Sequence, residues 1–192
     1  IAGTIELVDS AFLTDIPGWK HDAGTELLGI KAKYPDFSWK SQEIRPGLPR
    51  DAFDMNITVL TPRGRATHAI VAAMRREGEV NTADFKPALF NNGFLFAAIH
   101  QINFFRSANP GWTEVTGVEC WLKDGRVIQP IFIQLDPVNF SINNVPYKLV
   151  DLQALFPLWL LESDQELRFA IFFQGKDPYI VKFSAKKVRD LR

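Results

Sequence analysis

Apolar and polar residues alternate clearly in the segment 53–60. Apolar side chains occupy every second position from Phe53 to Val59, and polar residues lie between them. This period of two predicts a β-strand with one face towards the core and one towards water. Weaker alternation predicts two more strands, at 4–8 and 25–34.

Three other segments have patterns typical of helices. Residues 66–77 carry an apolar stripe at helical spacing, which predicts a helix preceded by a turn at 62–65. Residues 82–106 are read as a helical region whose second half is apolar nearly all round, which is typical of a buried helix. The Leu-rich segment 147–162 predicts two short helical turns separated at Pro157.

Two hairpins are expected in the C-terminal half. Strand-like runs flank Asp124-Gly125 within 118–135, and this dipeptide is a strong signal for a two-residue turn. A second pair of strands is expected at 167–174 and 179–184.

These elements predict a single α+β domain over residues 1–192, in which a mainly antiparallel sheet built from hairpins packs against a helical layer. The expected parts are an irregular N-terminal part at 1–50, the helical region at 66–106 and a hairpin-rich part at 115–185. Residues 186–192 are expected to form a charged tail.

Composition supports a folded domain and gives a weak indication of compartment. The chain of 192 residues has 16 Phe and 5 Trp, enough to build a core, and its 22 basic residues balance 22 acidic ones. The single cysteine, Cys120, favours a reducing compartment, so we expect cytoplasmic localisation. The apolar runs are far shorter than the ~20 residues of a membrane-spanning helix, and no signal peptide is visible.

No catalytic residue, metal site or cofactor is predicted from the motifs. His21, His68 and His100 are far apart and lack the clustered partners that zinc requires. His100 falls in the expected buried helix and is interpreted as a core histidine. Cys120 alternates with apolar residues in a strand, which indicates a packed, inert thiol.

A basic cluster is the main polar feature of the sequence. Arg63 and Arg65 are placed on a turn before the expected helix, and Arg75 and Arg76 near its end, where the helix dipole alone would favour them. We expect these four residues to contact an anion or an acidic protein partner. Nucleic-acid binding through the same four arginines is an alternative.

Four tryptophans lie beside polar or turn residues and are candidate interface anchors: Trp19, Trp39, Trp112 and Trp121. Burial of Trp121 under another element of the same chain would give the same sequence pattern, so both interpretations stay open.

The function expected from these features is that of a non-enzymatic interaction or assembly protein that self-associates or binds a protein partner, with nucleic acid less favoured. Residues 53–65, a strand and a basic turn leading into a helix, resemble part of some viral matrix proteins, which would imply a structural role and a viral or phage origin. The alternative is an enzyme whose site is assembled from dispersed carboxylates and arginines.

Overall fold

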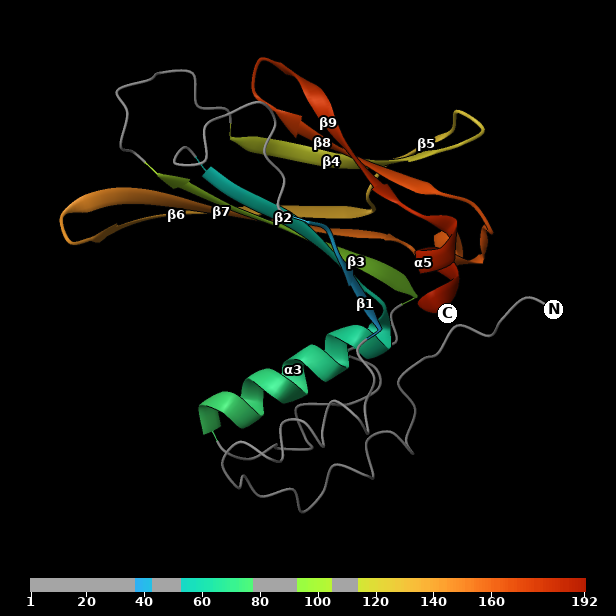
Figure 1. The fold of residues 1–192 in the computed structure, drawn as a ribbon, viewed down its shortest axis with the longest axis horizontal. Coiled ribbons are helices and arrows are strands. Elements are labelled where there is room, and N and C mark those ends of the chain that lie inside the picture. Colours follow the sequence, from blue (N-terminus) through green and yellow to red (C-terminus); the bar gives the residue numbers. More distant parts are fainter. Residues whose placement is uncertain (1–36, 43–52, 78–92, 105–113) are drawn as a thin grey trace.

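A computed structural model describes residues 37–42, 53–77, 93–104 and 114–192 of the chain. Within them the chain forms two antiparallel sheets, each lying against the other (Figure 1). The larger sheet has the strand order β1 (Ser38–Lys40), β2 (Phe53–Leu60), β3 (Phe94–Phe104), β7 (Val145–Pro157) and β6 (Phe132–Ile142). The smaller sheet has the order β5 (Val127–Ile128), β4 (Val115–Leu122), β8 (Leu167–Phe173) and β9 (Lys176–Phe183). The strands expected at 4–8 and 25–34 lie outside the described residues.

The core lies between the two sheets. Alternate residues of β2, β3 and β7 face the smaller sheet, which contributes alternate residues of β4, β8 and β9. At its centre, the ring of Phe169 packs against those of Phe156 and Phe183, with centroids 5.8 Å and 6.2 Å apart. The apolar row expected on the last hairpin is therefore the core face of β8.

The expected α+β fold with a helical layer at 66–106 is wrong, because the described part of the chain is nearly all antiparallel sheet. Residues 94–104 form the central strand β3 and not a helix. Leu95, Ala97 and Ile99 are buried towards the smaller sheet, while Phe96 on the other face is half-buried. A strand covered on both faces has a nearly continuous apolar sequence, which resembles that of a buried helix.

Of the two helical turns expected at 147–162, the one before Pro157 is wrong. Residues 145–157 form β7, which pairs with β3 on one side and β6 on the other. Only the short 3-10 helix η2 (Leu158–Glu162), which follows Pro157, is helical.

The helix α3 (Pro62–Glu77) confirms the expected helix but starts earlier than predicted. The Thr61 hydroxyl accepts a hydrogen bond from the Gly64 backbone N–H at 3.1 Å, as an N-terminal cap does. Pro62 occupies the first helical position, where its missing N–H costs nothing. Arg63 and Arg65 consequently belong to the first helical turn. The helix packs against β2 and β3 on the face of the larger sheet that points away from the smaller sheet (Figure 1).

A hairpin turn is present at Asp124-Gly125, but it has three residues, Lys123 to Gly125, instead of the two predicted. Gly125 has a φ of +89°, which a residue with a side chain rarely adopts, and its N–H bonds to the Leu122 carbonyl at 3.1 Å. The second arm of this hairpin is shorter than predicted. Strand β5 ends at Ile128, and the following residues cross to the larger sheet as β6.

The second predicted hairpin is also confirmed, as β8 and β9, with a tighter turn at Gln174-Gly175. The expected charged tail is instead the helix α5 (Ala185–Asp190), which is capped by Ser184. It buries Val188, and Leu191 after it is also buried in the core.

Candidate interaction surface

Strand β6 is an edge strand with exposed apolar side chains on both faces. Among the described strands it pairs with β7 alone, and β7 is the one described element that packs extensively against it. Its large exposed side chains, with the exposed fraction of each, are Phe132 (51%), Ile133 (44%), Leu135 (41%), Val138 (49%) and Ile142 (52%). A contiguous exposed apolar surface of this kind marks an interaction site.

The part of this surface on the core side of the larger sheet is exposed because the smaller sheet does not extend over it. Ile133 and Leu135 are opposite Ala154 and Leu152, which are fully buried between the sheets. These β6 side chains therefore point to the core side of the larger sheet. The element of the smaller sheet nearest that edge, β5, has two residues. The apolar core-side face of β6 thus extends beyond the area that the smaller sheet covers.

The other sheet edges have features that disfavour pairing with a second chain. Strand β9 carries Lys176, Asp177, Pro178 and Lys182, and strands β1 and β5 have only three and two residues. Charges, prolines and short length all protect edges against further pairing. Strand β6 has one proline, Pro137, and one charged side chain, Asp136, but with eleven residues it is the longest of these edges. Among the described edges, β6 is the one suited to strand addition.

The tip of the β6–β7 hairpin extends beyond the smaller sheet (Figure 1). Asn143 and Asn144 form its two-residue turn, with φ values of +52° and +63°. Behind the turn, the rings of Phe140 and Tyr147 stack with centroids 5.4 Å apart. They line a shallow depression of about 310 Å³ together with Asn139, Ser141 and Pro146.

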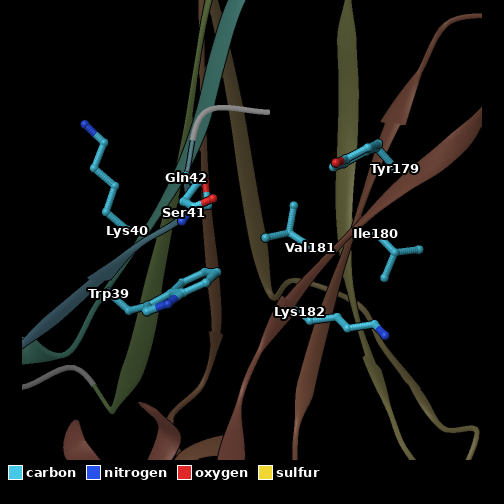
Figure 2. Close-up of a pocket in the computed structure, with 8 residues that line it drawn as sticks. All are labelled: Trp39, Lys40, Ser41, Gln42, Tyr179, Ile180, Val181 and Lys182. Atoms are coloured by element: carbon cyan, nitrogen blue, oxygen red, sulfur yellow. The ribbon is translucent and has the colours of Figure 1, made fainter. Parts of the chain in front are cut away.

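A second, open groove of about 480 Å³ separates β1 from β9, the other edges of the two sheets (Figure 2). Trp39 lies across its floor and packs on Phe183, with ring centroids 4.5 Å apart. Lys40 points away from the groove. The groove is lined by Trp39, Lys40, Ser41, Gln42, Tyr179, Ile180, Val181 and Lys182, none of which is acidic.

A row of polar residues crosses the outer face of the larger sheet. Asn56, His100, Asp151 and Asp136 are in register on four neighbouring strands. The interpretation of His100 as a core histidine is wrong, because it lies on a strand, is half exposed, and its Nδ1 contacts the Asp151 carboxylate. Within the described residues, no group of three or more His, Cys, Asp or Glu side chains is placed to hold a metal ion. Gln134 donates to Asp136 at 2.7 Å beside this row.

The four predicted arginines do not converge on one site. Arg63 and Arg65 lie over the rings of Phe37 and Phe96, at 5.2 Å and 5.0 Å from the centroids, and burial lowers the pKa of both guanidinium groups. Arg75 and Arg76 are exposed in the last turn of α3, ~18 Å further along the helix. Cation–π packing thus accounts for the first pair, and contact with an anion, an acidic partner or nucleic acid stays a prediction.

Of the four predicted tryptophans, Trp39 and Trp121 are described, and Trp19 and Trp112 lie outside the described residues. Trp121 is half-buried on the outer face of the smaller sheet, and its indole N–H donates to Glu119 at 2.7 Å. Its role as an interface anchor stays a prediction. Trp159, in η2, is more exposed and was not predicted, because its Leu-rich surroundings suggested a buried element.

Cys120 is fully buried on the core face of β4, as its sequence position indicates. Burial raises the pKa of its thiol to about 12, so the thiol stays protonated at neutral pH. No described helix is long and apolar enough to cross a membrane. No known protein family, curated protein sequence or solved structure matches this chain.

Proposed function

We propose that the protein is a non-enzymatic assembly protein whose copies join through the exposed edge strand β6. The observation that carries this proposal is the combination of a strand edge that no other described strand pairs with and apolar side chains on both faces of that strand. Addition of a strand to such an edge forms backbone hydrogen bonds and buries the side chains of both strands.

A second copy of the chain fits this edge better than a charged partner does. The chain has zero formal net charge, so copies do not repel one another at long range. Between Ile131 and Ile142 the one charged side chain is Asp136, which already accepts a hydrogen bond from Gln134. The edge therefore offers apolar surface and backbone groups rather than a charge pattern for an oppositely charged ligand.

The size of the apolar surface is compatible with reversible association. Full burial of a large apolar side chain contributes ~1.5–3 kcal/mol, and about half of that remains to be gained for each exposed side chain of β6. Complete burial of the five such side chains of each copy would give at most on the order of 10 kcal/mol, and strand addition covers only their flanks, so the gain does not greatly exceed the ~4–15 kcal/mol cost of association. Backbone hydrogen bonds across the edge add to the favourable side. We therefore expect the mass in solution to rise with concentration.

Sedimentation equilibrium of the full chain over a range of concentrations tests the proposal. Leu135→Lys places a charge in the apolar edge and should keep the protein monomeric. Leu135 is exposed, so the melting temperature of the variant should change little. Tyr179→Lys is the matched control, because Tyr179 is an exposed large side chain on β9, another edge strand. It should associate like the wild type.

Two results would contradict the proposal. One is a wild-type protein that stays monomeric at every concentration. The other is association that Leu135→Lys leaves unchanged, since β6 would then not be the contact.

A further inference from the structure

We infer that two copies pair their β6 strands antiparallel about a two-fold axis at Leu135, because among the registers that symmetry allows this one alone places the Asp136 carboxylate opposite a side chain that can donate to it. This inference rests on the proposed function and specifies its geometry. It would join the two larger sheets into one continuous sheet.

The turn at Asn143-Asn144 determines which backbone groups of β6 are free. A two-residue turn closes on a hydrogen-bonded pair, here Ile142 with Val145. Hydrogen-bonded pairs alternate along an antiparallel ladder, so the even-numbered residues of β6 bond to β7. The odd-numbered residues direct their backbone groups to the free edge, where Pro137 lacks an N–H.

Symmetry restricts the register further. A two-fold axis perpendicular to the sheet makes the two β6 strands antiparallel. It also keeps the core-side faces of both copies on the same side of the joined sheet. Because successive side chains point to opposite faces, residues opposite one another must both be odd or both be even. The axis therefore passes beside one residue, which lies opposite its own copy.

An axis at Leu135 aligns residues 132–138 of the two strands, and within this overlap only the Ile133 carbonyl, opposite Pro137, lacks a backbone donor. Leu135 lies opposite Leu135, and Phe132 lies opposite Val138, an aromatic pair with a β-branched residue. Gln134 lies opposite Asp136 of the other copy. The Gln134 amide has two N–H groups and donates one to Asp136 of its own strand, so the second can bond to the opposite carboxylate.

The neighbouring registers are worse for definite reasons. An axis at Asp136 places two carboxylates directly opposite each other, which is destabilising. An axis at Pro137 places the Asp136 carboxylate opposite the apolar side chain of Val138, which cannot donate to it. An axis at Gln134 places Asp136 opposite Phe132, and an axis at Val138 places it opposite Phe140, so in both registers an apolar ring faces the carboxylate.

Cysteine cross-linking of the full chain tests the register. In an antiparallel hydrogen-bonded pair the Cα atoms are ~5.5 Å apart, which suits a disulfide. Leu135→Cys should give a covalent dimer under mild oxidation, seen on a non-reducing gel. Val138→Cys is the matched control, since its two copies would be ~20 Å apart along the strands and should stay monomeric on the gel. A mixture of Phe132→Cys and Val138→Cys chains should form the mixed dimer.

The outcomes separate this inference from the proposal on which it rests. If the wild type dimerises and Leu135→Lys abolishes dimerisation, but Val138→Cys cross-links and Leu135→Cys does not, the axis is elsewhere and only the register is wrong. If the wild type does not dimerise, both the proposed function and the register are wrong. Cross-linking of Leu135→Cys and of the mixed pair, without cross-linking of Val138→Cys, supports the register.

Discussion

The side-chain oxygen of Gln101 accepts a hydrogen bond from the backbone N–H of Val115 at 3.0 Å, and both residues are fully buried. Gln101 belongs to β3 in the larger sheet, and Val115 begins β4 in the smaller one. This polar contact therefore joins the two sheets inside an otherwise apolar core, and it satisfies an N–H that begins β4.

Replacing Gln101 tests this link. Gln101→Leu keeps most of the side-chain volume but leaves the Val115 N–H without its acceptor, so the free energy of unfolding should fall by ~1–3 kcal/mol. Gln153→Leu is the control, because Gln153 is exposed on β7 in the same sheet and its loss should cost no more than ~0.5 kcal/mol. Equal values from urea unfolding of the two variants would contradict the structural role of Gln101.

Phe169→Ala should be among the most damaging core substitutions. Phe169 is fully buried and contacts the rings of Phe156 and Phe183, so its removal leaves a cavity and should cost ~3–5 kcal/mol. Phe172→Ala, on the half-buried outer face of the same strand, should cost clearly less. A loss below ~1 kcal/mol for Phe169→Ala, measured by chemical unfolding, would show that this face is not core.

The hairpin turn between β4 and β5 depends on a positive φ at Gly125. Gly125→Ala should lower stability by ~1–2 kcal/mol, because a side chain strains this left-handed conformation. Gly117→Ala is the matched substitution in β4, where no atom lies within 4 Å of the added methyl carbon and φ is not positive. The melting temperature of Gly125→Ala should therefore be lower than that of Gly117→Ala. Equal melting temperatures would show that the turn does not depend on the positive φ at Gly125.

The buried thiol of Cys120 predicts a loss of stability at alkaline pH. Burial raises its pKa from the ordinary 9.0 to about 12, so above pH 9 the unfolded chain releases a proton that the folded chain keeps. The contribution of Cys120 is thus complete below pH 9 and declines as the pH rises towards 12, by up to ~1.4 kcal/mol per pH unit. Urea unfolding between pH 8 and 10.5 should show a steeper decline for the wild type than for Cys120→Ala. Identical slopes would mean that the thiol ionises as easily in the folded state.

The sequence predicted the elements whose signals are local. Strand β2 follows from strict alternation, and the turn at Gly125 from a dipeptide that requires a positive φ. Strand β3 was missed because it lies between other strands and is covered on both faces, so that Leu95, Phe96 and their neighbours form one apolar run. Strand β7 was missed because its Leu-rich sequence resembles that of a helix.

The candidate site could be predicted only in part. The apolar character of the segment from Ile131 to Leu135 was recognised, but the segment was assigned to the hairpin with β4. Its actual place, at the edge of the other sheet, depends on pairing with β7, and no local pattern determines such a long-range pairing. The arginines and tryptophans were chosen because they are conspicuous in sequence, yet Arg63, Arg65 and Trp39 pack against rings of the same chain.

Amide hydrogen exchange at Ile133 tests the central claim most directly. The Ile133 N–H faces the free edge of β6, so it should exchange quickly in monomeric Leu135→Lys and slowly in the wild type at concentrations where copies associate. The Leu152 N–H, in the interior strand β7, should exchange at the same rate in both proteins. Strong protection of Ile133 in the wild type alone is the result we predict. Equally fast exchange of Ile133 in an associated wild type and in the variant would contradict assembly through β6.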